Sequence, residues 1–95
     1  MRDYELVFIV SPSVADEDIE KVTERVSQLI ANNGGEVIQT KPWGRKRLAY
    51  SIGDHREGYY FEIRFKMSPA ATKELERSLK LTEEIIRYLL TKIGE

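Results

Sequence analysis

The chain has 95 residues, a length that allows one domain spanning residues 1–95 and no second one. Its 15 lysines and arginines nearly balance its 16 aspartates and glutamates, and the resulting net charge of −1 argues against a uniformly basic nucleic-acid-binding module. The absence of cysteine excludes a disulfide framework, a thiolate metal site and a cysteine nucleophile. No apolar run is long enough to span a membrane, so we expect a soluble intracellular protein.

The first third of the chain predicts a strand followed by a helix. Residues 4–10 are rich in aromatic and β-branched residues and end at a Ser-Pro-Ser turn, as expected for a strand. Ser13 is the expected N-cap of a helix whose apolar residues recur with a period near 3.6. The helix should end at the Asn-Asn-Gly-Gly segment of residues 32–35, because glycine tolerates the left-handed backbone of a helix C-cap.

Residues 36–67 are expected to form two strands joined by a turn. Residues 36–52 are extended in this prediction, with an interruption at Pro42. Since proline cannot donate a hydrogen bond to a sheet, we expect an edge position or a bulge there. Residues 53–58 are typical of a turn. Residues 59–67 alternate apolar and polar side chains, so one face of this strand should lie in the core.

The last third of the chain predicts a short helix and a final strand. Ser68 is the expected N-cap and Pro69 occupies the first position of a helix that runs to about residue 80. Residues 85–93 fit a helix or a strand, and their β-branched and aromatic residues favour the strand. The order β-α-β-β-α-β predicts an α+β, ferredoxin-like fold, in which a four-stranded antiparallel sheet carries two helices on one face.

The near-neutral total charge hides an uneven distribution. Residues 1–35 have three basic and seven acidic side chains, whereas residues 36–66 have seven basic and four acidic ones. The basic residues of the central hairpin flank Trp43, an arrangement that suits RNA because cations meet phosphates and rings stack on unpaired bases. These cations are Lys41, Arg45, Lys46 and Arg47. The alternative is a solvated edge strand whose positive charge prevents aggregation.

A second aromatic segment, Glu-Gly-Tyr-Tyr-Phe at residues 57–61, resembles the core of the RNA-recognition-motif signature on the third strand of the same fold. Glu57 stands where that signature has lysine or arginine, and Tyr60 stands where it has a small residue. Tyr59 and Phe61 share a face with the apolar residues of their strand, so we expect these two rings in the core and not on an RNA surface.

No motif in the sequence predicts catalysis. His55 beside Asp54 is half of an acid–base pair, but no nucleophile is placed by a known motif, and an exposed turn histidine is the simpler interpretation. No metal or nucleotide motif is present, so we expect neither a metal site nor a cofactor. A small phosphatase of the acylphosphatase type needs an anion-binding loop after the first strand, and residues 11–14 offer neither arginine nor glycine.

The segment Gly-Arg-Lys-Arg-Leu-Ala-Tyr-Ser-Ile at residues 44–52 resembles the signature of the bacterial small-subunit ribosomal protein S-six family. The resemblance extends over essentially the whole chain. It includes the opening Met-Arg-x-Tyr-Glu, Pro12, the Gly-Gly of residues 34–35, the Gly-Tyr-Tyr of residues 58–60 and the Ile-Ile-Arg-Tyr-Leu-Leu of residues 85–90. The fold of that family agrees with the fold expected from the sequence pattern.

The resemblance implies a non-enzymatic structural component of the small ribosomal subunit in the cytoplasm. It further implies binding to small-subunit ribosomal RNA together with ribosomal protein S-eighteen, with no membrane and no small-molecule substrate. RNA or partner contact is carried over to Arg2, Lys46, Arg47, Tyr50 and Arg87. Charge and expected exposure add Arg45, His55, Arg56 and Lys92.

The first strand also has a second apolar face, made by Val7 and Ile9. These residues are either a docking site for a partner protein on the open face of the sheet or a patch shielded by long side chains such as Arg64 and Lys66. The alternative function is a ferredoxin-like protein-interaction module that binds no RNA. Such a module would not need the basic signature strand.

Overall fold

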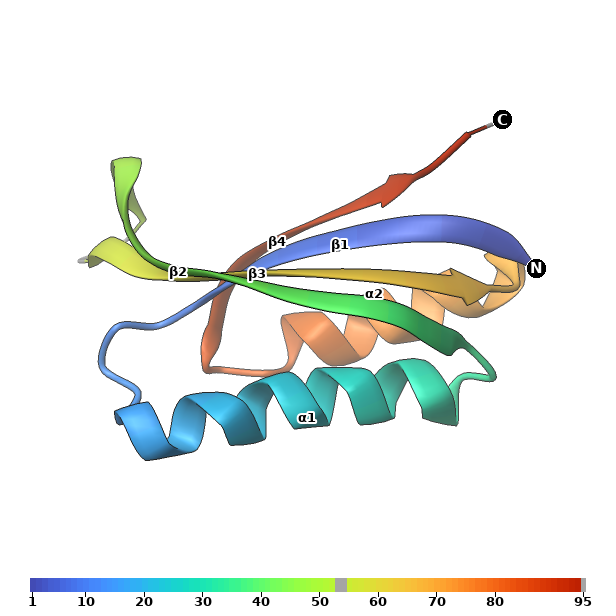
Figure 1. Ribbon diagram of the computed structural model, residues 1–95, viewed down its shortest axis with the longest axis horizontal. Coiled ribbons are helices and arrows are strands. Elements are labelled where there is room, and N and C mark those ends of the chain that lie inside the picture. Colours follow the sequence, from blue (N-terminus) through green and yellow to red (C-terminus); the bar gives the residue numbers. More distant parts are fainter. Residues whose placement is uncertain (53–54, 95) are drawn as a thin grey trace.

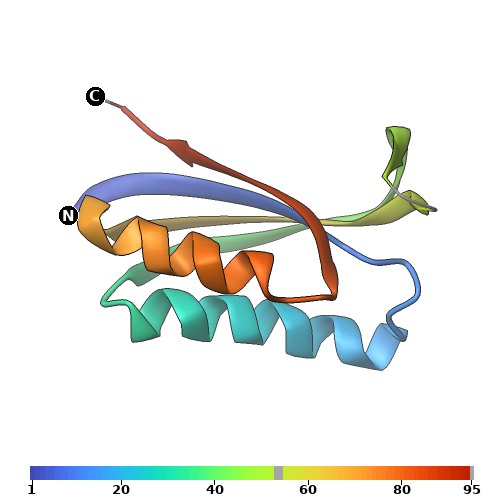
Figure 2. The ribbon, with the colours of Figure 1, turned by 180° about the vertical axis from the view of Figure 1, so that it is seen from behind.

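The computed structural model describes residues 1–52 and 55–94, and for residues 49–52 and 55 the backbone only. In chain order the elements are β1 (Arg2–Val10), α1 (Asp16–Asn32), β2 (Glu36–Ile52), β3 (His55–Met67), a 3-10 turn (Pro69–Ala71), α2 (Thr72–Lys80) and β4 (Ile85–Lys92). The strands form one antiparallel sheet in the order β2-β3-β1-β4. Both helices cover the same face of this sheet (Figure 1), as the view from behind also shows (Figure 2). The ferredoxin-like fold expected from the sequence is confirmed.

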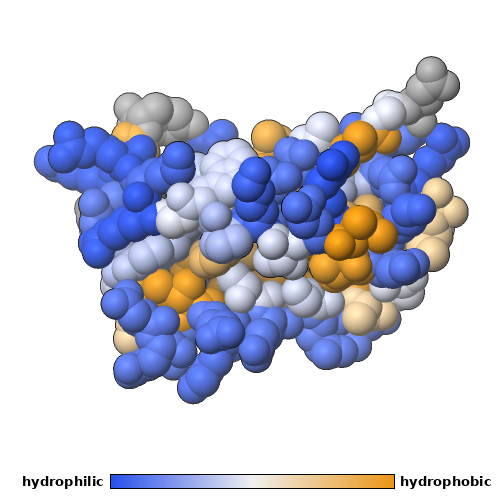
Figure 3. All heavy atoms as spheres, in the orientation of Figure 1, coloured by the Kyte–Doolittle hydropathy of each residue, from blue (hydrophilic) through white to orange (hydrophobic). Residues whose placement is uncertain are grey.

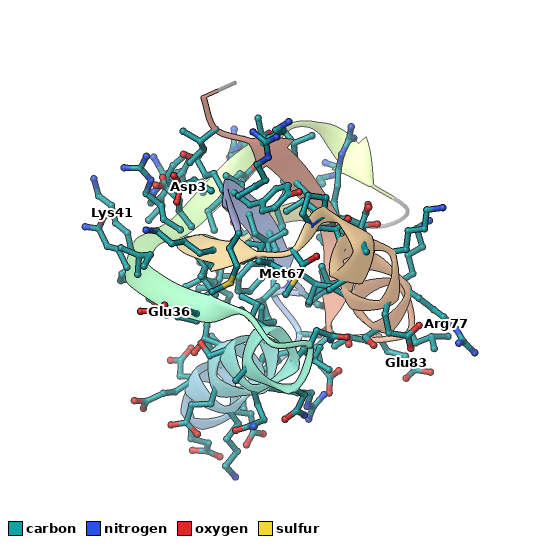
Figure 4. The ribbon with its side chains drawn as sticks, turned by 90° about the vertical axis from the view of Figure 1, so that its right-hand side faces the viewer. Asp3, Glu36, Lys41, Met67, Arg77 and Glu83 are labelled. Carbon is teal, nitrogen blue, oxygen red and sulfur yellow. The ribbon has the colours of Figure 1, made fainter. Side chains whose placement is uncertain are left out.

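The core lies between the sheet and the two helices. Leu6 and Phe8 of β1 pair with Ile63 and Phe61 of β3, and paired residues of adjacent strands project to the same face. The helices contribute the buried residues Val22, Val26 and Ile30 from α1 and Leu75 and Leu79 from α2. Figure 4 shows Met67 between the sheet and the helices. The apolar alternation of residues 59–67 therefore identified the core face of β3 correctly.

Helix α1 starts later than its sequence suggests. Its N-cap is Ala15, and no side chain caps it. Ser13 instead belongs to a turn with Ser11, in which the two hydroxyl oxygens lie 2.7 Å apart and the Ser13 N–H donates to Ser11 Oγ at 3.2 Å. The expected Ser13 cap is wrong because the two serines satisfy each other's hydrogen bonds before the helix begins.

The other end of α1 follows the expectation. Gly34 adopts a left-handed backbone with φ of +78°, and its N–H donates to the carbonyl of Ala31 at 3.0 Å. The N–H of Gly35 donates to the carbonyl of Ile30 at 2.9 Å. This pair of hydrogen bonds satisfies two of the last helical carbonyls and directs the chain into β2.

The hairpin of β2 and β3 is longer than the sequence indicates. Because β3 begins at His55 and its Glu57 and Gly58 pair with Arg47 and Lys46, the segment 55–58 is strand. The expected turn is wrong for these four residues. Gly58 is not part of a turn; it lies in the strand, where a side chain would clash with Ile9 of β1. The rest of that expected turn, residues 53 and 54, lies outside the described residues.

β2 is an edge strand with a bulge directly after Pro42, as the sequence predicts. Pro42 pairs with Phe61 and Gly44 pairs with Tyr60, so Trp43 is an extra residue without a partner in the ladder. Gly44 has a φ of +86°, in the left-handed region that glycine occupies without strain. The bulge therefore determines the orientation of the Trp43 side chain.

The hairpin and the ends of the chain lie at opposite ends of the molecule. In Figure 1 the hairpin projects beyond the sheet at one end and bends away from the helices, while the N-terminus and the end of β4 lie at the other. The longest dimension of the protein is 36 Å. Charges on the hairpin and charges near the chain ends therefore belong to two separate surfaces.

Candidate nucleic-acid interface

The basic residues of the β2–β3 hairpin project into solvent at one end of the sheet. Arg45, Lys46 and Arg47 on β2 and Arg56 on β3 are all exposed. Figure 3 shows this end, at the upper left, covered by hydrophilic side chains. Successive residues of a strand project to opposite faces, so Lys46 belongs to the open face of the sheet, whereas Arg45 and Arg47 belong to the helix side. The hairpin thus has basic side chains on both faces.

On the helix side, Arg45 is already engaged by a carboxylate. Its guanidinium donates to Glu57 across the hairpin, and its Cζ atom lies 5.6 Å from the centre of the Tyr59 ring. The hydrogen bond with Glu57 raises the already high pKa of Arg45. The Tyr59 hydroxyl donates to Asp16 Oδ1 at 3.0 Å, a contact that raises the pKa of Tyr59 and joins the hairpin to the first turn of α1. Of the two arginines on this face, Arg45 is thus neutralised within the protein.

On the open face, Trp43 stacks with Tyr60 and contacts Lys46. The ring centres of Trp43 and Tyr60 are 6.2 Å apart and their planes differ by 2°. The Nζ atom of Lys46 lies 5.8 Å from the centre of the Trp43 ring. Within residues 1–52 and 55–94, Lys46 makes no ion pair. The open face therefore presents two aromatic rings beside a positive charge that has no ion-pair partner in the part of the chain that the structure describes.

The sequence-predicted cations fall into two groups. Arg87 pairs with Ile9, which pairs with Tyr60, so Arg87 lies two strands, or about 10 Å, from Tyr60 at the hairpin end. Arg2 lies seven residues before Ile9 on β1, about 23 Å away, and Lys92 is the last residue of β4. The structure brings Arg87 to the hairpin end but leaves Arg2 and Lys92 at the opposite end of the sheet.

Two further sequence-predicted residues are Tyr50 and His55. Their backbones belong to β2 and β3, close to the last described residue of β2 and at the start of β3. Their side chains lie outside the described residues, so their contact with RNA or a partner stays a prediction from the sequence.

The apolar pair of β1 lies on the open face, but its two residues differ in exposure. Ile9 is only 7 % exposed, so the expectation of an exposed Ile9 is wrong. Neither of the suggested long side chains shields it, because Arg64 pairs with Glu5 and Lys66 lies farther along the strand. Ile9 instead packs on the backbone of Gly58, next to the side chain of Ile86. Val7 remains partly exposed.

The exposed apolar residue of this patch is Leu89, which no motif in the sequence indicates. Leu89 pairs with Val7 across β1 and β4 and is 64 % exposed. Tyr60 is a second residue that no motif indicates, although its alternation with core-facing neighbours places it on the open face. Its contact with Trp43 depends on the bulge. In the sequence, the Pro-Trp-Gly segment of residues 42–44 is the feature that indicates this bulge.

The helix side is less suitable for a polyanion than the open face. A groove of about 410 Å³ separates the hairpin from α1, and Asp16 and Glu20 form part of its wall. Figure 3 shows apolar surface in this region, below the hairpin. RNA that entered the groove would meet two carboxylates, whereas RNA on the open face would meet Lys46 and aromatic rings.

The described residues offer groups for binding and none for metal chemistry. Among the side chains that the structure describes, no three aspartates or glutamates are grouped to hold a metal ion. In the same part of the chain, no helix combines the length and apolarity that crossing a bilayer would require. What the hairpin end can do is neutralise phosphates and contact flat rings.

Comparison with solved structures supports both the fold and the family. A crystal structure of 30S ribosomal protein S6 from Thermotoga maritima superimposes with a TM-score of 0.92 and 34% identity, covering 96% of this chain and 86% of that one. The C-terminal domain of the MgtC protein from Mycobacterium tuberculosis superimposes with a TM-score of 0.63 at 14% identity, which shows a shared fold alone.

Sequence comparison identifies the same family that the signature at residues 44–52 resembles. The chain is 45% identical to small ribosomal subunit protein bS6 of Moorella thermoacetica over 95 residues, covering all of this chain and 97% of that protein. The profile of the family described as Ribosomal protein S6 matches residues 3–92. The chain therefore belongs to the ribosomal protein S6 family, which makes it a structural protein of the small ribosomal subunit, located in the cytoplasm as part of the ribonucleoprotein that carries out translation.

Proposed function

We propose that this protein binds small-subunit ribosomal RNA through its β2–β3 hairpin, together with ribosomal protein S-eighteen. The observation that carries the proposal is the group of Trp43, Tyr60 and Lys46, in which an exposed cation without an ion-pair partner among the described residues lies against stacked rings. Cations next to exposed aromatic rings are the combination that RNA-binding surfaces use.

The two faces of the hairpin contribute unequally in this proposal. Lys46 and Arg47 supply the phosphate contacts, each from its own face of the strand. Arg45 contributes less, because Glu57 already neutralises it. Phosphate contacts position the protein on the RNA without reading its sequence. A narrow two-sided ribbon with a cation on either face suits a site where RNA lies on both sides of the hairpin.

Salt dependence tests this proposal. Each phosphate that a cation neutralises adds close to one unit to the slope of log K against log salt concentration. Removing two such cations in a Lys46→Ala/Arg47→Ala variant should lower the magnitude of the slope by about two units. The measurement is filter binding to the central domain of small-subunit ribosomal RNA with S-eighteen present, over a series of KCl concentrations.

The matched control is a Lys73→Ala/Lys80→Ala variant, which makes the same change in net charge on the exposed surface of α2. Its slope should equal that of the unchanged protein. An unchanged slope in the hairpin variant rejects the two phosphate contacts. An equal reduction in both variants means that net charge, and not the hairpin, controls binding. A protein that stays at the top of a gradient containing small subunits, at low and high salt, rejects the whole proposal.

The same proposal assigns the partner protein to the apolar part of the open face. Leu89 and Val7 form a small apolar patch there, next to the buried Ile9. A Leu89→Ala variant should bind S-eighteen more weakly by about 1 kcal/mol or more, as expected for an apolar contact inside an interface. Leu81, 73 % exposed at the end of α2, supplies the control, and Leu81→Ala should leave the affinity unchanged in a calorimetric titration.

A further inference from the structure

We propose that Trp43 and Tyr60 form a stacking site for an unpaired base of the bound RNA. The proposal deepens the RNA binding proposed above and rests on it. It assigns a binding role to two uncharged residues and names what they recognise, namely a flat nucleobase that has left its helix.

The bulge in β2 is what turns Trp43 toward this site. Pro42 pairs with the core-facing Phe61 and Gly44 with Tyr60, so the extra residue Trp43 lies beside Tyr60 on the open face. Gly44 contributes no side chain next to the rings, and nothing lies within 4 Å of the place that its Cβ atom would occupy. The bulge thus presents the indole and leaves open space along the strand beside it.

The geometry of the two rings suits stacking of a third one. Their planes differ by only 2°, and their centres are 6.2 Å apart. Trp43 is 41 % exposed and Tyr60 is partly exposed, so part of the surface of each side chain remains accessible to solvent. The other stacked pairs, Tyr4 with Phe65 and Phe8 with Phe61, are buried in the core. Among the described residues the pair of Trp43 and Tyr60 is the stacked pair open to solvent.

The surrounding charge favours a nucleotide over a protein side chain. Lys46 lies over the Trp43 ring, and the Arg87 position is about 10 Å from Tyr60. A base has a larger face than an ammonium group and can displace Lys46 from the indole, after which Lys46 reaches a phosphate of the same strand. A protein surface docked on the rings would have to bring a carboxylate for Lys46, because burying the ammonium group unpaired is unfavourable.

Variants at Trp43 test the proposal, with Trp43→Phe keeping an aromatic face and Trp43→Leu keeping only apolar bulk. Affinity for the central domain of small-subunit ribosomal RNA, with S-eighteen present, is measured by filter binding over a series of KCl concentrations. Thermal unfolding checks that both variants fold, as expected for an exposed residue of an edge strand. Stacking is not an ionic contact, so Trp43→Leu should weaken binding by about 5- to 150-fold with an unchanged salt slope. Trp43→Phe should retain most of the affinity.

A direct readout comes from emission, because Trp43 is the one tryptophan of the chain. Stacking with a base should quench its fluorescence when RNA is added, after subtraction of the signal from the Trp43→Phe complex. If Trp43→Leu binds RNA as tightly as the unchanged protein, the stacking site is overturned while the proposed RNA binding stands. If Trp43→Leu loses affinity for S-eighteen without RNA, the rings are a protein contact and the stacking site is equally overturned. If the unchanged protein binds no RNA, both proposals fail together.

Discussion

Ile9 packs on the backbone of Gly58, so closely that a Cβ atom at position 58 would lie 2.4 Å from Ile9 Cγ2. The same atom would be 3.1 Å from the carbonyl oxygen of Val10. Position 58 therefore admits no side chain, although β3 continues through it without interruption. This contact buries Ile9 on a face of the sheet that no helix covers, and it holds the base of the hairpin against β1.

The first prediction concerns that contact. Gly58→Ala should lower the free energy of unfolding by about 1–3 kcal/mol, because the added methyl group overpacks a rigid site between two strands. Urea unfolding of the two proteins measures the difference. An Ile9→Ala change removes the atom that the new methyl group meets, so the double variant should lose less stability than the two single variants together. Simple additivity would mean that Ile9 is not the source of the strain.

The second prediction concerns the bulge at Gly44. Its φ of +86° is unfavourable for a residue with a Cβ atom, and Gly44→Ala should cost about 1–2 kcal/mol in unfolding free energy. Asparagine tolerates the left-handed region better than alanine, so Gly44→Asn should cost less. Both variants should also change the emission of Trp43, since the bulge holds its ring. Equal losses for the two variants would show that backbone conformation does not determine the cost.

The third prediction concerns the hydrogen bond from Tyr59 to Asp16, which raises the pKa of Tyr59. A raised pKa means that the folded state favours the protonated phenol. The stabilisation is therefore fully present below the unfolded-state pKa of about 10 and is lost as the pH rises through the higher folded-state pKa. Thermal unfolding as a function of alkaline pH should show a steeper loss for the unchanged protein than for Tyr59→Phe.

Tyrosinate absorbance provides the control for this titration. Burial and a hydrogen bond to Glu76 also raise the pKa of Tyr88. The Tyr88→Phe variant therefore shows which part of the alkaline absorbance change comes from Tyr88. Asp16→Asn keeps an oxygen acceptor but removes the charge, and it should lower the pKa of Tyr59 toward its ordinary value. A Tyr59 titration that is indifferent to Asp16→Asn contradicts the assigned cause.

The fourth prediction concerns the ion pair of Arg45 and Glu57. Both side chains are about half exposed, so Glu57→Gln should leave the unfolding free energy almost unchanged. The same change frees Arg45 for a phosphate, and it should strengthen RNA binding and steepen the salt slope by up to about one unit. Glu24→Gln on α1, eight residues along the helix from Asp16, makes an equal charge change and should leave the slope unaltered.

The elements of the fold could be predicted from the sequence because each has a local signal. The alternation of residues 59–67 and the glycines after α1 are examples in which local chemistry and tertiary structure agree. Two errors in the expected elements arise where they disagree. Serine is a common N-cap residue, but Ser13 forms its hydrogen bonds with Ser11. Glycine is a common turn residue, but Gly58 lies within a strand, where its contact with Ile9 leaves no room for a side chain.

The candidate site was only partly predictable. Charge and composition identify the cations of the hairpin, since these properties belong to single residues. They do not reveal that Glu57 neutralises Arg45 or that Trp43 meets Tyr60, because both contacts depend on the register between two strands. The bulge shifts that register by one residue, and a shift of one exchanges the two faces of a strand.

The placement of both chain ends at the end of the sheet opposite the hairpin has a practical consequence. A fluorophore, affinity tag or surface linker attached near Arg2 or Ile93 is separated from the hairpin by most of the 36 Å length of the molecule. Such an attachment leaves the hairpin facing outward from an immobilised protein. A dye near the chain ends and a second one on an RNA held at the hairpin would then report docking through a distance well within the range of energy transfer.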